Sequence, residues 1–183
     1  MAIRLNVGCG PSKFPGFINI DHRGEVADVV DDAFTLTTYK KGTVSEIVAS
    51  HILEHAQFDR TMTVLKRWHA LLVDGGVLWV AVPNFELVYT THLANYLNKK
   101  ITWEYFNSRI FGNAQAAHAM YGDGRIEGVD GMYAYELAFH RAVFTLPMLI
   151  NCLVLAGFRS VKGKDKLPYK KSHPHEICVR GTK

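Results

Sequence analysis

Two glycines flank a cysteine near the start of the sequence, at Gly8-Cys9-Gly10, and Asp21 follows after a short segment. Glycines let the backbone approach a ligand closely, so exposed N–H groups can meet a carboxylate or a phosphate. On its own the motif is equally typical of an ordinary tight turn. Asp21 favours a ligand site, because a carboxylate at the end of the next expected strand can accept both hydroxyls of a ribose. An NAD site is disfavoured, since the third glycine and the length for a crossover helix are both missing.

A second motif, HxxEH, spans residues 51–55. In inverted zincins two histidines one helical turn apart bind zinc and the glutamate acts as a base. That chemistry needs the motif inside a long helix and a third protein ligand, whereas here the strand-like run 46–50 leads directly into it. We therefore expect no metal, and keep a zinc-dependent hydrolase as the alternative function. For Glu54 and His55 the other interpretation is polarity at the start of a helix.

Residues 85–144 contain 12 of the 21 aromatic residues of the chain, together with a cluster of glycines. We expect this range to be an insertion that forms a lid over the ligand site, although packing against the sheet or a dimer surface would also explain its aromatics. His140 is the candidate general base, because it lies where the insertion returns to the sheet and imidazole titrates in the useful range. His55 is a second catalytic candidate. The candidates on the substrate side are His118, Tyr121, Tyr133 and Tyr135.

The elements that must position these residues follow from hydrophobic patterning. Alternating or continuous apolar runs predict strands, and apolar residues at helical spacing predict helices. For the expected helix 145–156, Thr145 is the predicted N-cap, Pro147 lies in the first turn, and Gly157 ends the helix. The expected strands are 3–7, 17–20, 27–30, 45–50, 77–82, 158–161 and 176–180, and the expected helices are 58–72 and 145–156.

Crossovers between successive strands favour an α/β fold. We therefore predict a single domain over residues 1–183, built on a doubly wound, mostly parallel sheet. The range 85–144 would be an insertion after the fifth strand.

Several of these segments, in this order, resemble class I S-adenosylmethionine-dependent methyltransferases. The resemblance implies a seven-stranded sheet and S-adenosylmethionine as cofactor. It also implies that the loop Gly8, Cys9 and Gly10 packs against the methionine part of the cofactor and that Asp21 binds the ribose. Asp32 would reach the adenine amino group, and His51 would border the methyl donor. The segments that carry the resemblance are 5–10, 19–21, 27–32, 51–55, 74–76, 82–84 and 156–158.

Three features depart from the pattern of that family. Asn6, a further candidate for cofactor binding, stands where many members have an acid, and Asp74 replaces a frequent proline. The first crossover is short, which resembles small bacterial members with trimmed N-terminal helices. The predicted activity is methyl transfer to a small polar acceptor, with a sugar hydroxyl as first choice. A cofactor-binding module without activity is the remaining alternative.

The composition of the chain indicates which kinds of partner and which cellular compartment to expect. The chain has 183 residues, 48% of them hydrophobic, and a net charge of +4 that arises in residues 159–183. Lysines scattered around a terminal strand are typical of a solvated surface, so we expect a small-molecule substrate rather than nucleic acid. Three widely spaced cysteines, and no apolar stretch of about 20 residues, favour a reduced, cytoplasmic protein without a membrane span. The oligomeric state is not predicted.

Overall fold

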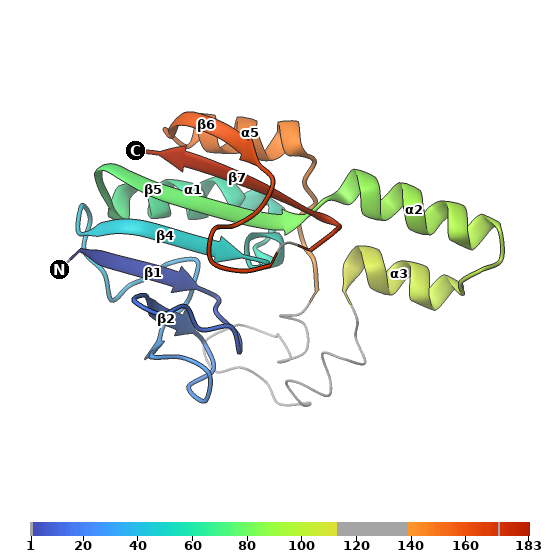
Figure 1. The fold of residues 1–183 in the computed structure, drawn as a ribbon, viewed down its shortest axis with the longest axis horizontal. Helices are drawn as coiled ribbons and strands as arrows, with labels where there is room; N and C mark the ends of the chain where they lie inside the picture. The colour runs from blue at the N-terminus through green and yellow to red at the C-terminus, as the bar shows by residue number, and fades with distance from the viewer. Residues whose placement is uncertain (1, 113–138, 172) are drawn as a thin grey trace.

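The computed structural model describes residues 2–112, 139–171 and 173–183. Within these residues, seven strands form one sheet in the order β3-β2-β1-β4-β5-β7-β6 (Figure 1). The elements follow along the chain as β1 (Ile3–Val7), β2 (Ile18–Asp21), β3 (Val29–Val30), β4 (Val44–Ser50), η1 (Leu53–His55), η2 (Phe58–Arg60), α1 (Thr61–Leu71), β5 (Leu72–Pro83), α2 (Phe85–Leu97), α3 (Trp103–Phe111), α5 (Leu146–Leu155), β6 (Arg159–Lys164) and β7 (Glu176–Thr182).

The sheet is mixed. Strands β1 to β5 pair with one another in parallel, whereas β7 runs antiparallel to both β5 and β6. The reason is the link between β6 and β7, a loop without a crossover helix, which returns the chain in the opposite direction. The prediction of an α/β fold with a seven-stranded sheet is confirmed, and the description of that sheet as mostly parallel is corrected.

Helices α1 and α5 both pack on the same face of the sheet (Figure 1). Trp68 of α1 is fully buried there, and its indole N–H donates to the carbonyl oxygen of Ala33 over 2.8 Å. A doubly wound sheet would carry helices on both faces, so this part of the prediction is wrong for the described residues. The physical reason is length, because the segments that join β1, β2 and β3 are too short to form a crossover helix.

Two loop segments cover the opposite face. Phe14 and Phe17, from the loop after β1, and Leu167, from the loop after β6, form a second core cluster against the sheet. The ring of Tyr169 lies 4.8 Å from that of Phe17, and its hydroxyl donates to Glu46 Oε1 over 2.7 Å. Aromatic side chains in loops thus take the place of the missing helices.

The junction between α1 and β5 differs from the sequence-based prediction. The helix ends at Leu71, and β5 begins at Leu72 instead of residue 77. Leu72 pairs with Val44, and the next pair is Val77 with Glu46, so residues 73–76 bulge out of the ladder. Gly75, at φ +78°, allows this bulge, because side-chain-bearing residues rarely adopt that conformation.

The predicted caps of α5 are confirmed. Thr145 Oγ1 accepts from the backbone N–H of Met148 over 3.5 Å, and a proline lies in the first turn. The backbone N–H of Gly157, a residue at φ +105°, donates to the carbonyl oxygen of Val154. The backbone N–H of Phe158 donates to the carbonyl oxygen of Leu153. These two bonds form a Schellman motif, which ends the helix and directs the chain into β6.

Helices α2 and α3 extend away from the sheet beyond the ends of β4 and β5 (Figure 1). Asn84 caps α2 by accepting from the backbone N–H of Leu87. Because residues 113–138 lie outside the described residues, the insertion over 85–144 and its action as a lid stay predictions. Among the helices that the structure describes, none has the length and hydrophobicity needed to cross a membrane.

Candidate cofactor loop and histidine cluster

The loop after β1 depends on glycine at two positions. Gly8 has φ +64°, and a Cβ built there would lie 2.6 Å from Cγ1 of Ile52. Gly10 has φ +50°, but a Cβ there would meet only Arg23 Nη2, at 3.7 Å. Gly8 is therefore required by close packing against residue 52, whereas a Cβ at Gly10 would make only an ordinary contact with the end of the Arg23 side chain.

Asp21, at the end of β2, faces this loop. Its side chain is 7% exposed, and Oδ2 accepts a hydrogen bond of 2.9 Å from the backbone N–H of Gly10. Oδ1 accepts from the backbone N–H of Arg23 over 3.1 Å and lies 3.2 Å from His22 Nδ1. A carboxylate has about four acceptor positions, so Oδ2 retains capacity for a further donor. The structure thus brings Asp21 and the glycine loop together, as predicted.

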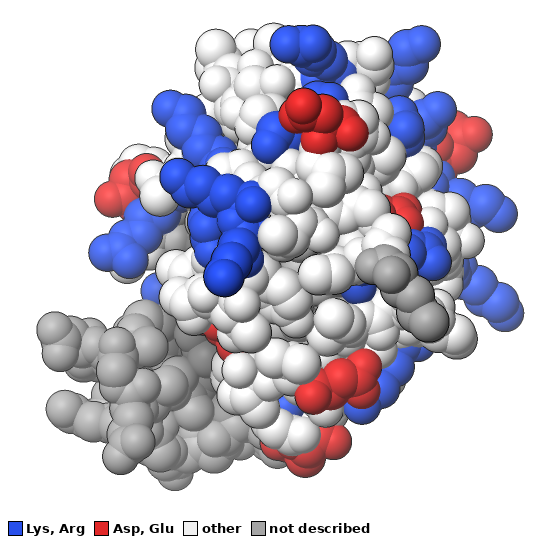
Figure 2. Space-filling model, turned by 90° about the vertical axis from the view of Figure 1, so that its left-hand side faces the viewer, with Lys and Arg blue, Asp and Glu red and all other residues white. Residues whose placement is uncertain are grey.

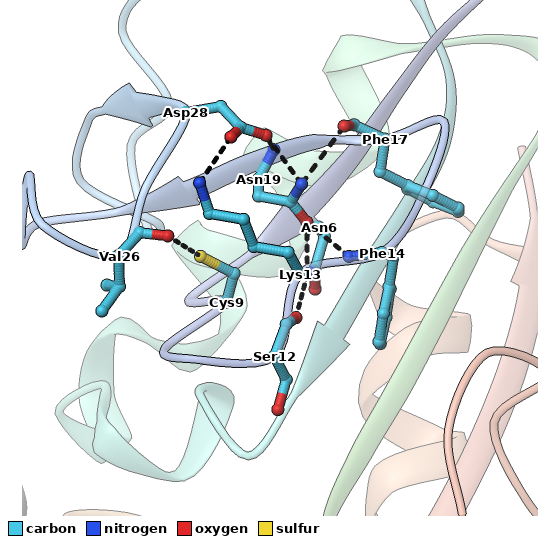
Figure 3. Close-up of polar contacts among 9 residues, drawn as sticks. All are labelled: Asn6, Cys9, Ser12, Lys13, Phe14, Phe17, Asn19, Val26 and Asp28. Atoms are coloured by element: carbon cyan, nitrogen blue, oxygen red, sulfur yellow. Dashed lines mark hydrogen bonds and ion pairs between the residues drawn. The ribbon is translucent and has the colours of Figure 1, made fainter.

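Asn6 is 2% exposed, and its side-chain amide bonds to the loop after β1 and to β2 (Figure 3). Nδ2 donates to the carbonyl oxygen of Ser12 and to Oδ1 of Asn19, each over 2.9 Å. Asn19 in turn donates to Asp28 Oδ2 over 2.7 Å from its side chain and 3.0 Å from its backbone. An amide fits this position because both of its partners are oxygens that accept. Direct contact between Asn6 and a cofactor stays a prediction.

Asp28 and Asn19 were missed from the sequence. Hydrogen bonds from Lys13 and Asn19 hold the pKa of the Asp28 carboxyl down, at about 2. Lys13 Nζ lies 2.7 Å from Asp28 Oδ1, so the short crossover is tied to the segment before β3 (Figure 3). The available signal was Asn19 itself, a polar residue inside an apolar strand.

Cys9 and Asp32 both form hydrogen bonds with nearby residues of the protein. The Cys9 thiol points toward the Val26 carbonyl oxygen, 3.7 Å away (Figure 3), and burial raises its pKa to about 11. Asp32 is exposed just after β3, where its carboxylate accepts from Phe34 N over 3.0 Å and Thr35 Oγ1 over 2.9 Å. Both hydrogen bonds of Asp32 stabilise a turn. Its contact with the adenine amino group stays a prediction.

His51 directly follows β4 and has φ +54°, a conformation that is rare for any residue except glycine. Its Nε2 atom lies 2.9 Å from Glu176 Oε2, and its Nδ1 atom lies 3.4 Å from Glu54 Oε1. Burial opposes the charged imidazolium, but the bonds to these two carboxylates outweigh burial and raise the pKa of His51. Strained backbone of this kind is concentrated at functional sites. Glu176, from β7, was missed because no local pattern links it to residue 51.

The HxxEH motif is not a zincin helix. Residues 53–55 form one 3-10 turn, and α1 starts only at Thr61. His51 binds Glu176, while the His55 ring lies on the other side of the motif against His140. The alternative function, a zinc-dependent hydrolase, needs both motif histidines on one face of a helix. The structure does not place them so, and the prediction of a zincin helix at residues 51–55 is wrong.

Glu54, His55 and His140 form a compact cluster that the motif alone did not reveal. One ligand atom of each residue lies within 4.8 Å of the others. The imidazole rings of the two histidines have centroids 5.3 Å apart. Burial lowers the pKa of His140, which favours its neutral form. Glu54, Arg109 and His140 also line a small cavity of about 10 Å³, room for about one water molecule.

The remaining substrate-side candidates, His118, Tyr121, Tyr133 and Tyr135, lie outside the described residues. Of the two catalytic candidates, the structure brings His55 and His140 into contact with each other. His51 joins them indirectly, through the shared neighbour Glu54.

No protein-family profile and no curated protein matches the sequence. Solved structures do match the fold. A SAM-dependent methyltransferase from Archaeoglobus fulgidus is 16% identical, with a TM-score of 0.61 over 100% of this chain and 86% of that one. A Thermotoga maritima methyltransferase, described as a possible histamine N-methyltransferase, is 14% identical, with a TM-score of 0.59 over 100% and 82%.

A third similar structure contains ligands. The 1,6-didemethyltoxoflavin-N1-methyltransferase of Burkholderia thailandensis, solved with 1,6-didemethyltoxoflavin and S-adenosylhomocysteine, is 18% identical. Its TM-score is 0.58 over 100% of this chain and 71% of that chain. The strand order, the glycine loop and these matches agree: the chain has the fold of the class I S-adenosylmethionine-dependent methyltransferases.

Proposed function

We propose that the protein transfers a methyl group from S-adenosylmethionine to a small polar acceptor, with a sugar hydroxyl as the first candidate. The observation that carries the proposal is the bond between Gly10 and Asp21, which joins the glycine loop of β1 to the end of β2. The chain places β2 and β3 on one side of β1 and β4 and β5 on the other side, so the direction in which strands are added reverses at β1. In open α/β sheets such a switch point, at the carboxyl ends of the strands, is where ligands bind.

The residues at this point fit an adenosyl group. Asp21 Oδ2 offers acceptor capacity to ribose hydroxyls, and Gly10 leaves space where any other residue would place a Cβ. Asn6 would act indirectly on the cofactor, because its hydrogen bonds to Ser12 and Asn19 hold the glycine loop in position. When bound, S-adenosylmethionine supplies an electrophilic methyl group on a positively charged sulfur.

His140 would take the proton of a hydroxyl acceptor. Its Nδ1 atom lies 3.1 Å from the Ile110 carbonyl oxygen, which can only accept, so Nδ1 carries the hydrogen and Nε2 keeps a lone pair. An alkyl hydroxyl is too weak an acid to ionise at neutral pH, so a base at this position contributes to the rate. His55 would support it from a neighbouring position, 5.3 Å away between ring centroids.

The charge distribution supports a small acceptor. On the face drawn in Figure 2, Lys and Arg occur in separate groups with Asp and Glu among them, without one continuous basic surface. Binding to nucleic acid relies on such a basic surface to neutralise phosphates.

Mass spectrometry of the purified protein is the experiment that tests the proposal. Retained S-adenosylmethionine or S-adenosylhomocysteine, in stoichiometric amount, supports it. A screen with isotope-labelled methyl donor and a panel of sugars then separates an enzyme from a binding module, because only an enzyme passes the label to an acceptor. Binding without transfer to any class of acceptor would support the inactive module instead.

A further inference from the structure

We infer that Glu54, His55 and His140 form a binding site for one divalent transition-metal ion, with Zn²⁺ as the ion that suits the donors best. One carboxylate oxygen and one imidazole nitrogen from each histidine come within 4.8 Å of one another. The ligand set differs from that of the HxxEH motif, since His51 is replaced by a histidine distant in sequence. The inference goes beyond methyl transfer; because His140 Nε2 cannot bind an ion and accept a proton at once, the base role of His140 belongs to the metal-free protein.

The hydrogen bonds of the two histidines leave the same nitrogen free on each ring. His55 Nδ1 lies 3.1 Å from the Phe139 carbonyl oxygen, and His140 Nδ1 lies 3.1 Å from that of Ile110. A carbonyl oxygen cannot donate, so each Nδ1 carries a hydrogen and each Nε2 has an available lone pair. In metal-binding histidines the other ring N–H almost always donates to a carboxylate, a backbone carbonyl or a water, which orients the ring and fixes its tautomer.

Glu54 supplies the second, independent observation. Its side chain is 2% exposed; Oε1 is paired with His51 Nδ1 at 3.4 Å, whereas Oε2 has no hydrogen-bond partner within the described residues. The same imidazole ring binds Glu176 through Nε2, so one histidine is shared between two buried carboxylates. A buried carboxylate without such bonds is costly unless it is paired with a cation. His55 and His140 each bring one ring nitrogen close to this carboxylate.

Backbone hydrogen bonds hold the cluster together across a long stretch of sequence. The Glu54 carbonyl oxygen accepts from Arg141 N over 2.7 Å and from Ala142 N over 3.0 Å. The His140 backbone N–H donates to the Phe111 carbonyl over 2.9 Å. Main-chain contacts therefore hold the three ligands near one another, and side-chain rotation would bring donors that lie within 4.8 Å into the coordination shell of one ion.

The donors indicate which metal fits. Imidazole suits zinc and other transition metals, whereas magnesium and calcium prefer oxygen. Two histidines and one glutamate form a known catalytic zinc set, with donors about 2.0–2.2 Å from the ion and one position left open. The adjoining cavity, beside Arg109, has room for about one water molecule. An ion here would thus present a position to an oxygen-containing molecule.

Zinc binding to the tag-free protein, stripped with a chelator, tests the inference. Isothermal titration calorimetry with ZnCl₂ is expected to show one ion per chain. Glu54→Gln, which keeps the shape of the side chain, and His140→Ala are each expected to weaken binding at least about tenfold. The matched control is His69→Ala, which removes a partly buried imidazole that packs on Phe158. This control is expected to bind zinc like the wild type.

Cobalt substitution gives a second readout that needs no variant. The Co²⁺ protein is expected to show d–d absorption bands without the thiolate charge-transfer bands that cysteine ligands would add. The inference is overturned if zinc does not bind stoichiometrically, or if Glu54→Gln binds it as tightly as the wild type. It is equally overturned if His69→Ala loses the ion to the same extent, or if thiolate bands appear.

Discussion

The backbone N–H of Gly10 donates a hydrogen bond of 2.9 Å to Asp21 Oδ2. Through this bond a residue at the end of β2 shapes the loop at the end of β1. The same carboxylate also accepts from Arg23 N, so Asp21 sets the path of the chain on both sides of the strand end. A cofactor at this point would meet a loop that is already in place, which lowers the entropy lost on binding.

Gly8→Ala is expected to destabilise the protein strongly. The added Cβ would lie 2.6 Å from Ile52 Cγ1, at φ +64°. The left-handed backbone costs about 1–2 kcal/mol and overpacking about 1–3 kcal/mol more, measured as the loss in free energy of unfolding in urea. Gly42→Ala is the matched control, because φ is +68° and nothing lies within 4 Å. Equal losses in the two variants would show that Ile52 moves away freely.

Asn6→Asp introduces a carboxylate of the same size as the amide, and we expect it to destabilise this chain. The amide donates to two oxygens, those of Ser12 and Asn19, and a carboxylate would repel both. An uncompensated buried charge costs about 3–5 kcal/mol of unfolding free energy. The exposed Asn151→Asp on α5 is expected to change it by less than about 0.5 kcal/mol. A fully stable Asn6→Asp would contradict the role assigned to the amide.

Asp28 is expected to contribute to acid unfolding. Its pKa is about 2 in the folded protein, below the ordinary value of 3.8, because it accepts bonds from Lys13 and Asn19. A depressed pKa stabilises the fold above pH 4, and this contribution is lost as the pH falls from about 4 to about 2. In Asp28→Asn the dependence of unfolding free energy on pH should be shallower in that window. Lys13→Met should reproduce part of the change, and a slope identical to wild type in both variants would refute the assignment.

His140→Gln is expected to lower turnover by about 10²–10⁴-fold with the acceptor that the wild type methylates. Affinity for S-adenosylmethionine should stay near normal, because the cofactor loop does not contact His140. His69→Gln serves as the control for losing an imidazole elsewhere. Full turnover by a folded His140→Gln would remove His140 from the mechanism.

Local signals predicted where the glycine loop, Asp21 and the ends of α5 lie. The glycine loop, Asp21 and the caps of α5 are determined by residues close in sequence, so patterning located them. The histidine cluster depends on contacts between residues 54 and 140, and no local pattern brings them together. The face without helices is also a property of short connections, whose aromatic side chains cover the sheet instead.

Calorimetric titration with S-adenosylmethionine tests the central claim most directly. The wild type is expected to bind one cofactor per chain, and Asp21→Ala to bind it more weakly by about 1.5–3 kcal/mol, the range for hydrogen bonds to a charged group. Asp59→Ala, an exposed position in η2, should bind like the wild type. Absence of binding by the wild type, or unchanged affinity in a folded Asp21→Ala, would contradict the assignment of this site.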